Sequence, residues 1–147
     1  MSRSMTSSFF PDINVWIALQ HQSHRHHRSA VSWFRSLDKN EELIFCRHTQ
    51  IGMLRLLTTE AVMGHETLNQ RQCWALYMHW IAGGRAFLQG EPVGIDQAFQ
   101  ALTSADSPSP KAWADAYLAA FAECAGLTLV TFDQALAGRM KGAVLLG

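Results

Sequence analysis

The 147-residue sequence predicts an α/β fold in which a mostly parallel sheet is covered by helices on both faces. Three observations support this fold class. Short β-prone runs alternate with apolar patterns of helical spacing along the whole chain. The stretch 109–133 contains a helix, a glycine stop and a buried strand in succession. Aspartates also follow two of the expected strands, at the sheet edge where open α/β folds place their ligands.

The first part of the chain predicts two strands and four helices. Phe9 and Phe10 lead into a short first strand that ends near Asp12, although Pro11 lacks the N–H that a strand ladder uses. Apolar residues at helical or alternating spacing then indicate the other elements. These are a helix from about 15, a helix over 26–37, a strand over 43–46, a helix from about 48 and a helix over 66–81.

The second part begins where Gly83 and Gly84 end a helix. The organising helix starts after Pro110, whose missing N–H costs nothing in a first turn, and stops at Gly126, which suits a left-handed backbone. The expected elements are a strand over 85–89, a helix over 95–102, the helix from about 110, a strand over 127–131, one or two helical turns over 135–140 and a strand over 143–146.

Composition and charge exclude several classes of protein. Lys plus Arg equals Asp plus Glu at 12 each, so bulk charge does not indicate a nucleic-acid binder, although a local basic patch remains compatible. The three cysteines are widely spaced without a C-x-x-C motif, which argues against a disulfide framework or a zinc site. Without a signal-peptide core or an apolar run of about 20 residues, we expect a cytoplasmic protein with no membrane partner.

A polar segment after the first helix carries four histidines. His24 and His27 are three residues apart, a spacing that metal sites on helices can use. The neighbouring Gln, Ser and Arg residues instead favour a polar loop that opens the next helix, and we prefer this interpretation.

Three aspartates indicate a common site. Asp12 and Asp133 follow strands, and Asp115 lies about one turn inside a helix, beside a surface rich in alanine. Taken singly, Asp115 could complement the helix N-terminus and Asp133 could cap the next helix. The fold predicts all three around one crevice, where they would repel each other unless a cation were shared. Oxygen ligands suit Mg²⁺ or Mn²⁺, and a water on such a metal can attack a phosphodiester. The deduced chemistry is metal-assisted hydrolysis of a nucleic acid.

Four segments together resemble the successive motifs of PIN-domain ribonucleases, and most of all the VapC toxins of bacterial type II toxin–antitoxin systems. The segments are DINVWIA (12–18), TQIGMLRLL (49–57), PKAWADAYLAA (110–120) and LVTFD (129–133). The resemblance spans nearly the whole chain. It implies a single PIN domain over 1–147, with 1–6 as a disordered or extended N-terminus. The implied fold is a three-layer α/β/α sandwich.

The resemblance also implies an activity and partners. The implied activity is that of a Mg²⁺-dependent endoribonuclease, with Mn²⁺ as a possible substitute for the metal. The implied partners are a VapB-type antitoxin, which would inhibit the chain, and a second copy of the chain in a homodimer. By the motif match, Asp12 would be the first metal ligand. Asp115 and Asp133 would be the third and fourth acidic positions, which ligate metal or orient water. Thr131 would support the site beside Asp133.

The sequence departs from the family pattern at Gln50. The match of Thr49 to Arg55 places Gln50 where the family usually carries a glutamate. Glutamine keeps the length and a carbonyl oxygen but loses the charge. Either three carboxylates work with Gln50 and Asn14, or another acid such as Glu91 substitutes, although a plain loop glutamate is the preferred reading of Glu91. Asn14 could alternatively cap the first helix.

Other functions remain open at this stage. The change at Gln50 allows a weakened PIN domain that binds RNA or a protein without cutting, although the three aspartates argue against it. A receiver domain would need a central acceptor aspartate and a lysine late in a strand, and neither is evident. A haloacid-dehalogenase phosphatase would need an aspartate at Asn14, because that residue supplies its general acid.

RNA binding by a neutral chain requires local cations. Lys111 lies four residues before Asp115 on the same helix face and could contact a phosphate. Arg55 could contact RNA or form a salt bridge inside the fold. Trp113 could stack on an unpaired base, but we expect it to be a packed aromatic. The aromatic helix over 68–80 is expected to combine core packing with a dimer or antitoxin groove.

Overall fold

The computed structural model describes residues 7–147, so the expectation for 1–6 lies outside the described residues. Its sheet is parallel throughout, with strand order β3-β2-β1-β4-β5. The strands are β1 (Ser8–Pro11), β2 (Glu42–Phe45), β3 (Ala86–Leu88), β4 (Thr128–Thr131) and β5 (Val144–Leu145). Because the strands are parallel, all their carboxyl ends meet at one edge of the sheet.

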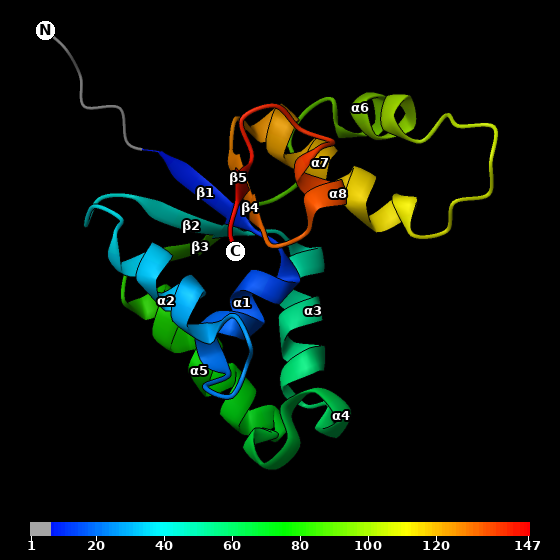
Figure 1. Ribbon diagram of the computed structural model, residues 1–147. Helices are drawn as coiled ribbons and strands as arrows, with labels where there is room; N and C mark the ends of the chain where they lie inside the picture. The colour runs from blue at the N-terminus through cyan, green and yellow to red at the C-terminus, as the bar shows by residue number, and fades with distance from the viewer. Residues whose placement is uncertain (1–6) are drawn as a thin grey trace, which may run out of the picture.

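Helices cover both faces of this sheet, as Figure 1 shows, and the predicted three-layer α/β/α sandwich is confirmed. One layer contains α1 (Ile13–Gln20), α2 (His27–Arg35), α3 (Arg47–Leu57), α4 (Glu60–Met63), the 3-10 helix η1 (Gly64–Glu66) and α5 (Gln70–Ala82). The other contains α6 (Ile95–Leu102), α7 (Ala112–Ala125) and α8 (Gln134–Ala137). Within residues 7–147, no helix has both the length and the apolar character that crossing a bilayer requires.

Neighbouring strand residues point into different cores. Phe9 packs with the α1–α5 layer, and the next residue, Phe10, is fully buried under α7. On β2, Leu43 and Phe45 face the first layer and Ile44 faces the second. Side chains alternate between the faces of a strand, so apolar residues at consecutive positions are required when both faces are covered. The continuous apolar runs of the sequence have this physical origin.

Helices α1 and α3 approach each other closely at Gly52. A Cβ atom added there would overlap the Cδ1 and Cγ1 atoms of Ile13. A larger residue at this position of α3 would therefore require the partly exposed Ile13 side chain to shift. The contact joins the first residue of α1 to the second turn of α3, and both helices begin at the carboxyl edge of the sheet.

The structure corrects some helix boundaries. Helix α1 begins at Ile13 because the side chain of Asp12 accepts a hydrogen bond from the Val15 backbone, so Asp12 is the N-cap. The alternative of Asn14 as the cap is wrong, since Asn14 lies inside the helix. Helix α5 begins only at Gln70, after its N-cap Asn69, and the short helices α4 and η1 precede it.

Candidate active site

Asp12 lies at the carboxyl end of β1, between two elements that hold its carboxylate. Its Oδ1 accepts a hydrogen bond from the Val15 backbone at 3.0 Å. Its Oδ2 accepts one from the Thr131 hydroxyl at 2.5 Å, across to the neighbouring strand β4. With 6% of its surface exposed, the side chain is fixed at the junction of β1, β4 and α1.

Burial raises the pKa of the Asp12 carboxyl from 3.8 to about 6, because the charged form loses hydration. The hydrogen bonds from Thr131 and Val15 oppose this rise, since they stabilise the ionised form. The charge of Asp133 adds to it. A nearby cation would favour the ionised form, so the electrostatics of Asp12 suit a metal ligand.

Asp133 is exposed just past β4 and has two structural contacts. Its Oδ1 caps α8 by accepting from the backbones of Ala135 at 2.8 Å and Leu136 at 3.3 Å. Its backbone N–H donates to the Thr131 hydroxyl at 2.9 Å. Asp133 therefore caps α8, the role considered for it when it is taken singly, and its place in a metal site stays a prediction. Thr131 connects Asp12 with Asp133 through its hydroxyl group.

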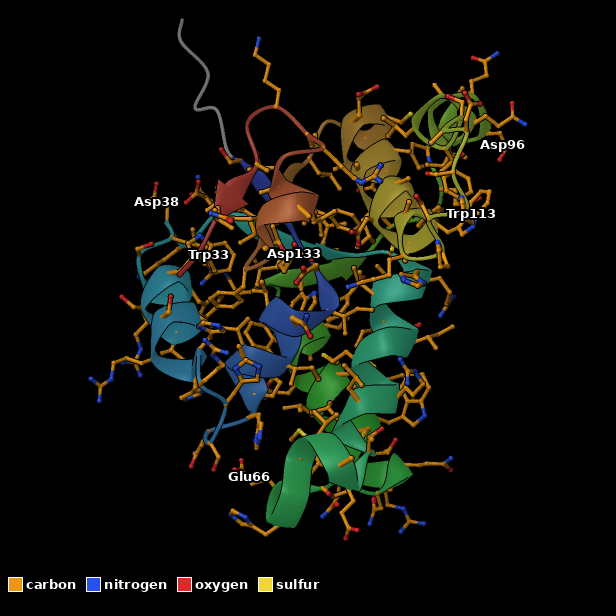
Figure 2. All side chains as sticks on the ribbon, turned by 45° about the vertical axis from the view of Figure 1, so that its right-hand side comes forward. Trp33, Asp38, Glu66, Asp96, Trp113 and Asp133 are labelled. Atoms are coloured by element: carbon orange, nitrogen blue, oxygen red, sulfur yellow. The ribbon has the colours of Figure 1, made fainter. Side chains whose placement is uncertain are left out.

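Asp115 lies in the first part of α7, half-buried. Its pKa is raised by burial and by the charge of Asp133, and lowered by the charges of Arg139 and Lys111. Asp133 thus acts on both Asp12 and Asp115. The structure brings the three aspartates into one electrostatic neighbourhood at the carboxyl edge, and Figure 2 shows Asp133 there beside the start of α8.

The carboxylate oxygens of the three aspartates suit a hard cation that keeps some of its waters, because they do not form a complete set of metal ligands by themselves. Within residues 7–147, no three His, Cys, Asp or Glu side chains are close enough to hold a metal ion by themselves. Mg²⁺ usually keeps several waters and takes one or two carboxylates. Each carboxylate oxygen has two lone pairs, and Asp12 and Asp133 use a few of them in the hydrogen bonds above. Asp12, Asp115 and Asp133 would therefore be able to hold Mg²⁺ in part through its waters.

The histidine segment forms a polar loop, which agrees with the preferred interpretation. His24 Nδ1 accepts from the His26 backbone at 3.0 Å, and His27 Nδ1 lies 2.7 Å from the carbonyl oxygen of Ala18. The Nδ1 of the buried His21 lies 3.2 Å from the Glu66 carboxylate, at the lower end of the molecule in Figure 2. These contacts tie the loop to its neighbours.

Gln50 lies buried near the start of α3, with 3% of its surface exposed. Its Oε1 accepts a hydrogen bond from Arg47 Nη1 at 2.7 Å. Thr49 fixes this first turn, because its hydroxyl accepts from the Cys46 backbone N–H at 3.0 Å. The neutral Gln50 is therefore satisfied by a cation. The Asn14 side chain is exposed inside α1, and its supporting role stays a prediction.

The Glu91 carboxylate has a hydrogen-bond partner other than the three aspartates of the candidate site. It accepts a hydrogen bond from the Tyr117 hydroxyl at 2.7 Å. The two residues line a cavity of about 240 Å³ with Arg47, at the ends of β3 and α3. The side chain of Glu91 is thus directed to Tyr117, and its role as a substitute acid stays a prediction.

The cations near the site differ from those the sequence singled out. Lys111 does lie near Asp115, as its effect on the Asp115 pKa shows. Arg139 acts in the same way, but the sequence analysis missed it, because nothing in its neighbourhood marks it as functional. Arg55 instead lines a groove of about 440 Å³ between α3 and α5 with Ile51 and Trp74. Its contact with RNA stays a prediction.

Trp113 corrects the sequence analysis. The side chain was expected to be packed, but 56% of its surface is exposed. An edge-on contact with Phe99, 6.1 Å between ring centroids, ties it to α6. Trp113 was expected to be packed because most aromatic side chains are, but more than half of its surface is left uncovered.

Comparison with known proteins identifies the family of the chain. The family model of the PIN domain matches residues 9–139. Ribonuclease VapC41 of Mycobacterium tuberculosis, in two strains, is 41% identical over 84% of this chain and 88% of its own length.

Among solved structures, the chain resembles M. tuberculosis VapC20, described as a Sarcin-Ricin loop cleaving toxin, with a TM-score of 0.67, 15% identity and coverage of 95% of this chain and 99% of that one. It also resembles VapBC-1 of nontypeable Haemophilus influenzae, with a TM-score of 0.64, 14% identity and coverage of 94% and 96%. At such identities the two structures support the fold, and the family follows from the sequence matches. The chain therefore belongs to the PIN-domain family, as a relative of the VapC ribonucleases.

Proposed function

We propose that this chain is the toxin of a type II toxin–antitoxin system and that it hydrolyses RNA phosphodiester bonds as a divalent-metal-dependent endoribonuclease. One observation carries the proposal. Asp12, Asp115 and Asp133 share one electrostatic neighbourhood at the carboxyl edge of β1 and β4, in a chain 41% identical to a ribonuclease. We propose Mg²⁺ as the metal, with Mn²⁺ as a substitute, and the whole of 1–147 as a single PIN domain.

The side chains of the site have different proposed roles because they occupy different positions. Asp12, held by Val15 and Thr131, offers its carboxylate in one fixed orientation. Asp133, whose charge acts on both Asp12 and Asp115, would orient the attacking water together with Asp115. A divalent cation bound there would supply a more acidic water and stabilise charge on the phosphoryl oxygens. Lys111, whose charge lowers the pKa of Asp115, would neutralise a phosphate there.

The partners follow from the relatives. We propose that a VapB-type antitoxin inhibits the chain, that the chain forms a homodimer, and that it acts in the cytoplasm. The groove between α3 and α5, which carries the exposed Ile51 and Trp74, is an apolar surface suited to a protein partner.

The test is cleavage of a mixed RNA pool by purified protein free of antitoxin, with Mg²⁺, with Mn²⁺ or with EDTA. We expect metal-dependent cutting by the parent and none by Asp115→Asn. Asp96→Asn, which changes an exposed aspartate on α6, is the matched control and should cut like the parent. Equal cutting by Asp115→Asn would contradict the assignment of the site.

The neutral Gln50 favours one alternative, a PIN domain that binds RNA or a protein without cutting. This alternative predicts that the protein binds RNA but does not cleave it, whichever metal is added. Gln50→Glu would then place a carboxylate beside Arg47, and a gain of cutting in that variant alone would support the alternative.

A further inference from the structure

A cavity of about 280 Å³ lies between the loop that joins α6 to α7 and the end of α8. Trp113, Ser109 and Arg139 are among its lining residues. The charge of Arg139 lowers the pKa of Asp115, so the cavity wall lies near the candidate active site. In Figure 2, Trp113 and Asp133 lie in the same upper part of the molecule, far from Glu66.

Arg139 is a cation without an anionic partner in this wall. Its Nη1 donates to the carbonyl oxygen of Leu102 at 3.5 Å, a long contact that sets its direction. Among the described residues, no Asp or Glu lies within salt-bridge distance of it. A half-buried guanidinium in this state suits a phosphate, which it can contact through two parallel N–H groups.

Trp113 gives the cavity an aromatic wall. The ring contacts Phe99 edge-on at an interplanar angle of 69°, while more than half of the side-chain surface stays exposed. Bases of single-stranded nucleic acids stack on such side chains with little dependence on sequence, and nearby cations track the backbone. Trp113 and Arg139 line one cavity and have this combination, and a second cation, Lys111, lies near Asp115.

The loop at the cavity mouth is held in a costly conformation. Ser109 has φ +30°, a backbone region that residues other than glycine seldom occupy. Its hydroxyl lies 2.8 Å from that of Ser107, and both serines line the cavity. Backbone strain of this kind is often found at ligand sites.

We propose that this cavity binds one unpaired base of a single-stranded RNA, next to the phosphate that the aspartates act on. Trp113 stacks on the base, and Arg139 contacts the adjoining phosphate. The volume is slightly below the roughly 300 Å³ at which pockets for whole small molecules begin, so it suits a single base. A base inside a duplex is not free to enter, and the RNA must therefore be unpaired there. This inference rests on the proposed function, because it assumes that RNA is the substrate.

The experiment compares intact RNA with RNA that has no bases. Fluorescence anisotropy measures Kd for a random pool of short single-stranded RNAs and for a matched abasic pool, both in EDTA, which prevents cutting. Trp113→Ala should bind the intact pool roughly 5- to 150-fold more weakly than the parent, the range that base–aromatic stacking supplies. For the abasic pool, parent and variant should have equal Kd values. Trp113→Phe should retain most of the affinity.

Two controls make the result specific. Trp74→Ala removes a tryptophan of similar exposure (50%) from the groove between α3 and α5, and should bind both pools like the parent. Arg139→Gln should weaken binding of both pools, because it removes a phosphate contact. Melting temperatures confirm that each variant is folded.

Equal affinity of Trp113→Ala and the parent for the intact pool, including no measurable binding by either, would overturn the proposal. An equal loss on both pools would also overturn it, because Trp113 would then act on the backbone or on the fold. Loss of antitoxin binding with RNA binding intact would assign Trp113 to a protein interface instead. The nuclease assignment is judged separately, by metal-dependent cutting in the assay of Asp115→Asn.

Discussion

Thr131 joins two residues of the site through a single hydroxyl group. The hydroxyl donates to Asp12 Oδ2 and accepts from the backbone N–H of Asp133. A hydrogen bond to the charged form of a carboxyl lowers its pKa, so Thr131 keeps Asp12 more acidic than burial alone would allow.

Thr131→Val should therefore raise the pKa of Asp12 above about 6, because valine has the same shape without the hydroxyl. The acidic limb of the pH–rate profile for RNA cutting is expected to move to higher pH, with the largest loss of activity near pH 6. Thr128→Val, on the same strand, is the control and should leave the profile in place. Superimposable pH–rate profiles for Thr131→Val and the parent would mean that Thr131 does not lower the pKa of Asp12.

Asp12 also makes the stability of the metal-free protein depend on pH. Its folded pKa of about 6 exceeds 3.8, so between these values the folded state binds more protons than the unfolded state. Stability should fall as pH rises from about 4 to 6 and stay low above that range. Asp12→Asn has no carboxyl to ionise at this position, so its stability should not fall in this way. We expect it to be more stable than the parent at pH 7.5 by at most about 3 kcal/mol, and to lose that advantage near pH 4.

Thermal unfolding in EDTA across this pH range measures the effect. The exposed Asp96→Asn serves as the control, with a curve parallel to that of the parent. If the Asp12→Asn curve were also parallel to that of the parent, the carboxyl would not carry the raised pKa.

The positions of Asp12, Asp115 and Asp133 drew attention because carboxylates at strand ends or inside an apolar helix are unusual, and the resemblance to PIN-domain motifs supplied their expected roles, which stay predictions. Arg139 and the exposure of Trp113 could not be predicted. Both depend on how α6, α7 and α8 pack against each other, and single-helix periodicity contains no information about that packing.

At the scale of elements, the contact between α1 and α3 positions the edge of the site. Helix α1 begins directly after Asp12, and Gln50 lies in the first turn of α3. Gly52 lets the two helices meet over Ile13. The glycine of the segment TQIGMLRLL (49–57) therefore has a packing reason.

Gly52→Ala should destabilise the protein by about 1–3 kcal/mol, the usual cost of overpacking, even though alanine is the better helix former. The new Cβ would overlap the Ile13 side chain. In an Ile13→Ala background the same change should become neutral or stabilising, because the overlapping atoms are gone. Urea unfolding of the four proteins measures this coupling, and additive effects would exclude the proposed contact.

Most elements were predictable because the long helices repeat apolar residues at helical spacing and the strands are short continuous apolar runs. The short helices α4 and η1 were not predicted, since four and three residues are too few to show a period. Helix α8 is as short, but it was expected because it directly follows a strand that ends near its cap, Asp133. The order of the strands was also beyond the sequence, because alternating β and α elements are compatible with several arrangements of a parallel sheet.

The whole molecule has equal numbers of acidic and basic residues, so its net charge does not attract RNA. Binding must depend on a few cations near the site, and Arg47, Lys111 and Arg139 are the candidates. Three phosphate contacts on a single strand predict a slope of about −2 for log K against log salt.

Arg139→Gln should reduce the steepness of this slope by about 0.7, because one phosphate contact is lost. Anisotropy titrations in EDTA at several salt concentrations give the slope. Arg71→Gln, an exposed change on α5, should leave the slope unaltered. A slope that responded equally to both variants would indicate diffuse attraction instead of local contacts.

The hydrogen bond between Asp12 and Thr131 joins residues 119 positions apart in the chain. Thr131, on strand β4, is translated 119 residues after Asp12, and Asp133 follows it. A nascent chain therefore has Asp12 long before it has a site, and contacts between such distant segments also form slowly. A ribonuclease with this topology cannot assemble its site, and so cannot cleave its own messenger RNA, before both segments have been translated.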